Sequence, residues 1–150
     1  MHARFAHVNL IARDWRRLAD FYVRVFACEP VPPPRSQAGD WLSRGTGVAD
    51  AALEGVHLRL PGSVGAGPTL EIYTYAETLE RGAPVAANRR GFGHLAFAVD
   101  DVDAAVAEVL TAGGARVGEV VERDVAGVGR LRFVYVADPE GNLLELQRWS

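Results

Sequence analysis

Short apolar segments separated by turn residues recur along the chain, and they predict strands rather than long helices. Two other segments carry apolar residues at helical spacing, and each follows an aspartate, a residue that commonly caps a helix N-terminus. The expected helices run from Asp14 to about Ala27 and from Asp101 to about Ala112, where Gly113-Gly114 ends the second one. The expected strands are residues 4–11, 41–44, 53–60, 69–75, 92–99, 116–124, 131–137 and 143–148.

Two stretches have neither pattern. Residues 29–40 contain four prolines, which lack a backbone N–H, so we expect an extended connection or a loop there. Residues 76–90 are polar and include Gly82 and Pro84, which predicts a linker between two halves of the chain.

The two halves repeat one arrangement of a histidine and an acidic helix start. His7 precedes Asp14 by the same interval that separates His94 from Asp101, and in both places a short apolar strand lies between them. The repeat indicates two copies of one module, in residues 1–76 and 91–150.

Each half also contains an apolar strand with a glutamate at its centre, Leu70-Glu71-Ile72 in the first and Leu144-Glu145-Leu146 in the second. The order of elements is then βαβββ, twice. We predict an α+β fold in which residues 1–150 form a single domain. Its two modules would build a cupped, antiparallel-rich mixed sheet with one helix behind each half.

Composition narrows the class of protein. The chain has 150 residues, 49% hydrophobic and 23% charged, which is ordinary for a globular protein able to bury one sizeable core. A net charge of −3 does not indicate the basic surface that proteins usually need to bind nucleic acid. No apolar run is long enough to span a membrane, and the N-terminus lacks a signal peptide, so a cytoplasmic protein is expected. The single Cys28 excludes an internal disulfide and is expected to be a buried thiol.

Strand parity predicts where the histidines and glutamates point. Side chains alternate faces along a strand, so His7 shares a face with Asn9, and His94 shares one with Ala96, while the larger apolar neighbours face the helices. Glu71 and Glu145 likewise point away from the aliphatic residues on either side of them. All four polar side chains are therefore expected on the concave side.

Two imidazoles and two carboxylates in one cup would bind a divalent metal ion, and the charge of the ion would offset the burial of the carboxylates. The expected ligands are His7, Glu71, His94 and Glu145, and they would bind one ion of Zn, Ni, Co, Mn or Fe. The remaining histidines, His2 and His57, lie outside the repeat and are expected to be surface or core residues.

These motifs resemble the vicinal oxygen chelate superfamily, which includes glyoxalase I, bleomycin-resistance proteins and extradiol dioxygenases. The resemblance covers nearly the whole chain. It rests on His7-Val-Asn-Leu10, Asp20-Phe-Tyr22, Leu70-Glu-Ile72, Gly93-His-Leu-Ala-Phe-Ala-Val-Asp-Asp101 and Asp138-Pro-Glu-Gly-Asn-Leu-Leu-Glu145. It implies two βαβββ modules around one metal ion, a small-molecule substrate and a homodimer.

The ligand set is most similar to that of glyoxalase I. The resemblance implies a metal-dependent lyase or isomerase that moves a proton beside a metal-bound carbonyl, with Glu145 as the first choice of catalytic base and Glu71 as the symmetric candidate. By the same resemblance, the metal sites of dioxygenases and fosfomycin-type enzymes in the superfamily have three protein ligands. A fourth ligand at Glu71 therefore argues against dioxygenase chemistry. A non-catalytic drug-binding protein remains an alternative, as does, less favoured, an extradiol-type dioxygenase.

Two positions depart from the glyoxalase I pattern. Ile11 stands where that family carries an arginine that contacts glutathione, and Tyr75 stands where it carries an asparagine. We expect a substrate less charged than a glutathione adduct, in a more apolar pocket. The candidate substrate-binding residues share faces with the expected ligands and are Phe5, Ile11, Tyr73, Tyr75, Phe92 and Trp149; packing within the cup alone would explain them equally well.

Overall fold

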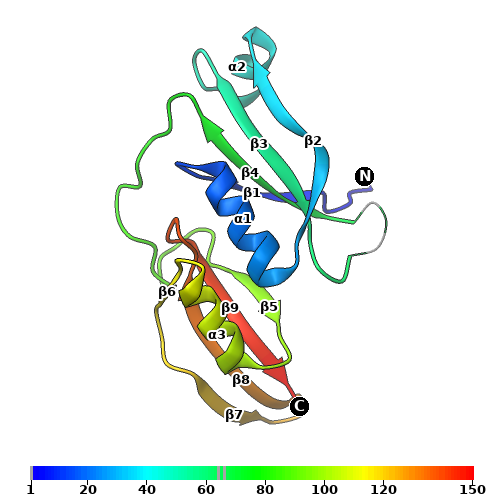
Figure 1. The fold of residues 1–150 in the computed structure, drawn as a ribbon, viewed down its shortest axis with the longest axis vertical. Helices are drawn as coiled ribbons and strands as arrows, with labels where there is room; N and C mark the ends of the chain where they lie inside the picture. The colour runs from blue at the N-terminus through cyan, green and yellow to red at the C-terminus, as the bar shows by residue number, and fades with distance from the viewer. Residues whose placement is uncertain (1, 64, 66) are drawn as a thin grey trace. The chain divides into compact units, whose positions relative to one another are not determined.

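Alternating apolar residues give each half of the chain a sheet with one face packed against a helix (Figure 1). The computed structural model describes residues 2–63, 65 and 67–150, and it divides the chain into two compact units, Met1–Glu80 and Arg81–Ser150. Each sheet mixes one parallel pair of strands with antiparallel pairs. The predicted α+β class with antiparallel-rich mixed pairing is confirmed, and the strands form two sheets.

The first unit contains a four-stranded sheet in the order β1-β4-β3-β2, with β1 and β4 parallel. Its elements are β1 (His7–Ile11), α1 (Trp15–Phe26), β2 (Glu29–Ala38), α2 (Asp40–Thr46), β3 (Ala52–Arg59) and β4 (Thr69–Tyr75).

Helix α1 packs on β3 and β4 through its apolar face. It begins where the Asp14 carboxylate accepts hydrogen bonds from the backbone N–H groups of Arg16 and Arg17, as predicted for an aspartate cap. The fully buried side chains of this core are Leu18, Phe21, Tyr22, Leu58, Leu70 and Ile72.

Two predictions for the first unit are wrong. The proline-rich segment expected to be a loop is strand β2, and the strand expected at 41–44 is instead part of helix α2. Strand β2 tolerates its prolines because it lies at the sheet edge and because its register shifts between Val31 and Arg35, where three of them lie. Helix α2 ends at Gly47, whose positive φ and N–H bond to the Ser43 carbonyl form a left-handed cap.

The second unit repeats the plan with the order β5-β9-β8-β6, and β7 also pairs with β8. Its elements are β5 (Leu95–Ala98), α3 (Val102–Thr111), β6 (Ala115–Arg116), β7 (Val121–Val125), β8 (Gly129–Ala137) and β9 (Leu143–Trp149). The single strand expected at 116–124 is divided between β6 and β7. Strand β5 is shorter than the expected 92–99, so His94 immediately precedes it.

Helix α3 packs against β8 and β9. Asp101 caps its start by accepting from the N–H groups of Asp103 and Ala104. After its end, Gly114 approaches β8 so closely that an added Cβ would lie 2.5 Å from the Ala137 carbonyl oxygen. The main buried side chains of this core are Val102, Val106, Val109, Val134, Val136, Leu144 and Leu146.

Residues 76–90 contain no helix or strand, in agreement with the predicted linker. Across the described part of the chain, no helix is long and apolar enough to cross a membrane.

Candidate metal centre

Parallel pairing of β1 with β4 brings His7 to Glu71. Asn9 is the register partner of Glu71, and His7, two residues earlier, lies on the same face of the sheet. His7 Nδ1 is 3.4 Å from Glu71 Oε1, and the Asn9 side-chain amide donates a hydrogen bond of 3.4 Å to Glu71 Oε2.

The second unit builds its pair by the same register. Ala96 on β5 is the partner of Glu145 on β9, and His94 again stands two residues before that partner. His94 Nε2 lies 2.9 Å from Glu145 Oε2. The repeated sequence pattern therefore corresponds to a repeated pairing of one histidine with one glutamate.

Burial of the two glutamates follows the predicted parity. Leu70 and Ile72 are fully buried on the helix side of β4, and Glu71 itself is only 8% exposed although it faces the other way. In β9, Leu144 and Leu146 are fully buried as well, and the Glu145 side chain is 15% exposed. Carboxylates this poorly hydrated are costly without a partner of opposite charge or a set of donors.

His57 is the residue of this face that the sequence interpretation missed. It was expected to be an unrelated surface or core residue, but β3 places it directly beside Glu71 in register. Its Nε2 lies 3.1 Å from Glu71 Oε1 and 2.8 Å from the Tyr73 hydroxyl. Burial lowers the pKa of His57, and the neighbouring Glu71 carboxylate only partly opposes that effect.

The sequence did contain a signal for this contact. Residues 61–68, between the expected strands 53–60 and 69–75, are rich in glycine and proline, which predicts a turn; folding the chain back at the middle of this segment brings His57 opposite Glu71 or its neighbour. The hairpin register has Arg59 opposite Thr69 and therefore His57 opposite Glu71.

A tyrosine accompanies each glutamate. Burial, with a contribution from Glu71, raises the pKa of Tyr73 to about 12. Burial also raises the pKa of Tyr135, and here the contributing charge is Glu145. Tyr135 is the register partner of Glu145, and its ring centroid lies 5.0 Å from that of His94. Both phenols therefore stay protonated near neutral pH and can donate hydrogen bonds.

The donor chemistry of the two pairs fits a divalent metal ion. Each pair supplies an imidazole nitrogen and a poorly hydrated carboxylate, which are common ligands for Zn, Ni, Co, Mn and Fe. Among residues 2–63, 65 and 67–150, no three histidine, cysteine, aspartate or glutamate side chains are arranged to hold an ion. Each pair supplies two of the four ligands predicted from the sequence.

The expected substrate-binding residues differ in burial. Tyr73 and Tyr75 share the Glu71 face of β4 and pack partly against Leu42 and Leu53. The other four are exposed: Phe5, Ile11, Phe92 and Trp149.

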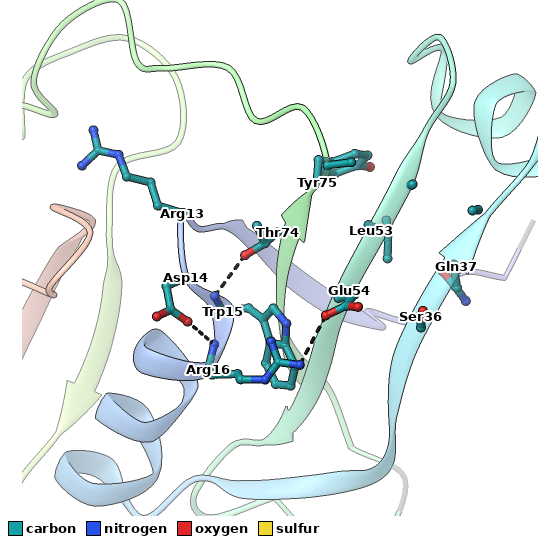
Figure 2. A pocket seen from close by; sticks show the side chains of 13 residues that line it. Arg13, Asp14, Trp15, Arg16, Ser36, Gln37, Leu53, Glu54, Thr74 and Tyr75 are labelled. Carbon is teal, nitrogen blue, oxygen red and sulfur yellow. Dashed lines mark hydrogen bonds and ion pairs between the residues drawn. The ribbon is translucent and has the colours of Figure 1, made fainter.

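A pocket of about 630 Å³ lies in the first unit, where α1 begins beside the ends of β2, β3 and β4 (Figure 2). Trp15, Leu53 and Tyr75 line it, together with polar groups such as Gln37 and Thr74. Tyr75 is the one expected substrate-binding residue in its wall. Neither His7 nor Glu71 lines the pocket, so it is separate from the paired histidine and glutamate.

The charged groups around this pocket are neutralised by one another. Arg16 lies 3.3 Å from the Glu54 carboxylate and 4.3 Å from the centroid of the Trp15 ring (Figure 2). The Thr74 hydroxyl accepts a hydrogen bond of 3.0 Å from the Trp15 backbone N–H. The Trp15 indole nitrogen is a buried donor with no hydrogen-bond partner among the described residues. The pocket thus offers an aromatic wall and little net charge.

Comparison with known proteins places these features in a family. The model of the glyoxalase/bleomycin resistance protein/dioxygenase superfamily matches residues 4–146. A 2-epi-5-epi-valiolone epimerase from Actinomyces is 33% identical in an alignment of 145 residues that covers 93% of this chain and 76% of the relative.

Solved structures share the fold. A glyoxalase family protein from Bacillus cereus superposes with a TM-score of 0.83 at 20% identity, covering 99% of this chain and 95% of the other. The fosfomycin resistance protein FosX from Listeria monocytogenes, solved with Mn(II) and sulfate, gives a TM-score of 0.53 at 17% identity over 100% of this chain and 95% of its own. The extent of the family match and the relative at 33% identity show that this chain belongs to the glyoxalase/bleomycin resistance protein/dioxygenase superfamily.

Proposed function

We propose that this protein is a divalent-metal-dependent epimerase or isomerase that moves a proton at a carbon beside a carbonyl. The observation that carries the proposal is the repeated register, which gives each unit one histidine and one poorly hydrated glutamate. The similarity to an epimerase supports the reaction class, because inverting a carbon beside a ketone requires the removal and return of one proton.

The proposed ligands are His7, Glu71, His94 and Glu145, which would hold one ion of Zn, Ni, Co, Mn or Fe. When bound, such an ion acts as a Lewis acid that polarises the carbonyl of the substrate. Two neutral imidazoles and two carboxylates balance the charge of a divalent ion. Binding of the ion would therefore offset the free-energy cost of burying both glutamates.

Glu145 is the proposed catalytic base, and Glu71 is the symmetric candidate. Glu145 has His94 as its close polar contact at 2.9 Å, whereas Glu71 is in contact with His7, Asn9 and His57. A carboxylate with fewer contacts can change position more readily to take a proton from carbon and form the enolate of the substrate. Returning a proton to the opposite face completes an epimerisation.

The substrate class follows from the relative and from the residues on the ligand face. The name of the relative's substrate, 2-epi-5-epi-valiolone, denotes a ketone, so this compound is the first one to test. Ile11 and Tyr75 replace the glutathione contacts of glyoxalase I, which favours a small substrate without a glutathione group. Phe5, Tyr73, Phe92 and Trp149 are the other proposed contacts, and a homodimer is the proposed assembly.

The test joins metal content to proton exchange. We expect the purified protein to bind about one divalent ion per chain, measured by elemental mass spectrometry. In D₂O, we expect it to incorporate deuterium into the ketone beside the carbonyl, followed by NMR. Glu145→Gln should lose deuterium incorporation by about 100-fold or more, because a positioned base contributes roughly that factor.

Glu119→Gln is the matched control, since Glu119 is an exposed carboxylate outside the proposed site. A protein that binds the ketone, with no exchange in the presence of any of the five metals, would be a binding protein rather than an enzyme. Oxygen uptake with catechols and Fe(II) would instead indicate a dioxygenase.

A further inference from the structure

His57, Thr69, Glu71 and Tyr73 form a polar cluster, here called the His57 cluster, on one face of β3 and β4. The imidazole of His57 is its centre. One nitrogen, Nε2, lies near both the Glu71 carboxylate and the Tyr73 hydroxyl, and the other, Nδ1, is 3.4 Å from the Thr69 hydroxyl.

Hydrogen-bond polarity selects one form of this imidazole. A carboxylate oxygen only accepts, so Nε2 must carry a proton to be a favourable neighbour of Glu71 Oε1 at 3.1 Å. Nδ1 of the neutral ring is then an acceptor, and the Thr69 hydroxyl is the donor that can serve it. The Nε2 N–H then lies between two acceptors, the Tyr73 hydroxyl at 2.8 Å and the Glu71 carboxylate at 3.1 Å, and the Thr69 hydroxyl holds the other side of the ring.

The backbone beneath the cluster restricts Tyr73 as well. Tyr73 pairs with Gly55 across β3 and β4, and a Cβ added to Gly55 would lie 2.2 Å from Tyr73 Cδ1. The tyrosine ring thus lies directly over the Gly55 backbone, in a space that the side chain of any other residue at position 55 would occupy. Its hydroxyl is held 2.8 Å from His57 Nε2.

The second unit lacks this arrangement. The register position of His57 beside Glu71 is occupied by Tyr135 beside Glu145. Glu71 consequently has an imidazole on each side, His7 and His57, whereas the imidazole in contact with Glu145 among the described residues is that of His94. The two halves are equivalent in their proposed ligands and different in what surrounds the carboxylate.

We infer that His57 is a positioning residue that holds the Glu71 carboxylate in the orientation needed to bind the metal ion, and that Tyr73 and Thr69 fix the imidazole for this purpose. The inference rests on the proposed metal site. Partners of this kind orient a ligand before the ion arrives, and their loss typically weakens metal affinity by about 10- to 100-fold. His57 itself needs no bond to the ion.

The first test measures binding of Co(II) alone by its visible absorption in the full-length protein. We expect His57→Ala to weaken Co(II) affinity about 10- to 100-fold. His57→Gln should restore part of the loss, because its amide can still donate to Glu71. Tyr73→Phe should fall between wild type and His57→Ala. His2→Ala is the matched control, since it removes an exposed histidine outside the cluster.

The outcomes separate the inference from the proposed function. If wild type binds Co(II) and His57→Ala binds it equally well, the positioning role is wrong while the metal site stands. A changed absorption spectrum in His57→Ala would instead show that the coordination depends on this residue, as we infer.

A second measurement needs no metal. In a double-mutant cycle on the metal-free protein, His57→Ala and Glu71→Gln should have non-additive effects on unfolding, because the two side chains are in contact. Additive effects would overturn the inference, whether or not the wild-type protein binds an ion. Failure of the wild-type protein to bind any ion would separately reject the proposed function. Circular dichroism of each variant checks that it is folded.

Discussion

At the scale of single residues, the proposed site depends on carboxylates that lie between apolar neighbours. Glu71 is 8% exposed and its two chain neighbours are fully buried, so its charge is stabilised by His7, Asn9 and His57 rather than by water. This placement could be predicted from strand parity. The contact with His57 could not be read from parity alone, because it depends on the hairpin register between two strands.

A different buried residue gives a test of the core by pH. Cys28 is 2% exposed, and burial raises the pKa of its thiol from 9.0 to about 11. Between these values the unfolded chain loses the thiol proton first, so unfolding is favoured as pH rises from about 9 to about 11. The expected loss of stability is up to about 2.5 kcal/mol.

The measurement is the free energy of unfolding in denaturant, for wild type and Cys28→Ala across this pH range. Wild type should lose stability more steeply than the variant, because the other groups titrate equally in the two proteins. Parallel curves would show that the thiol is hydrated in the folded protein.

At the scale of elements, local pattern identified most helices and strands but failed around residues 29–46. Four prolines in β2 argued for a loop, yet the segment lies at the sheet edge, where missing N–H donors cost little. Trp41 and Leu42 belong to a helix. The sequence predicted a strand there because an apolar run this short fits the period of a strand as well as that of a helix. The helix is favoured by the burial of Leu42, which packs against Ala51 and Leu53 of the following segment.

The helix starts at Asp14 and Asp101 provide a prediction at this scale. Each carboxylate accepts from two backbone N–H groups at the start of α1 or α3. Asp14→Ala and Asp101→Ala should each lower the free energy of unfolding by about 1 kcal/mol. Asp→Asn at the same positions should retain most of that stability, since asparagine caps equally well. Denaturant melts of the four variants test this, and equal losses for alanine and asparagine would attribute the effect to charge instead.

At the scale of the whole molecule, two units repeat one chemical pair. The β1–β4 and β5–β9 registers both place a histidine two residues before the partner of a glutamate. The proposed ligand set takes one histidine and one glutamate from each of these pairs. Metal binding is then expected to be linked to the stability of the whole chain.

That linkage can be measured by thermal unfolding with added Ni, Zn, Co or Mn. A ligand that binds only the folded chain stabilises it by about 2.7 kcal/mol at a free concentration one hundred times its dissociation constant. We expect the melting temperature to rise with metal and to return after chelation. The double variant Glu71→Gln, Glu145→Gln should show no rise, and an equal rise in that variant would indicate binding elsewhere.

The sequence by itself determined the repeated module, the family resemblance and the face on which the histidines and glutamates lie. These depend on local periodicity and on residue identity, which the chain carries without reference to its partners. Only the tertiary structure decided that the proline-rich segment is an edge strand and that His57 lies beside Glu71 with Tyr73. Both outcomes depend on which strands pair and in which exact register; the turn between β3 and β4 indicates that pairing only approximately, and packing of the whole sheet fixes it.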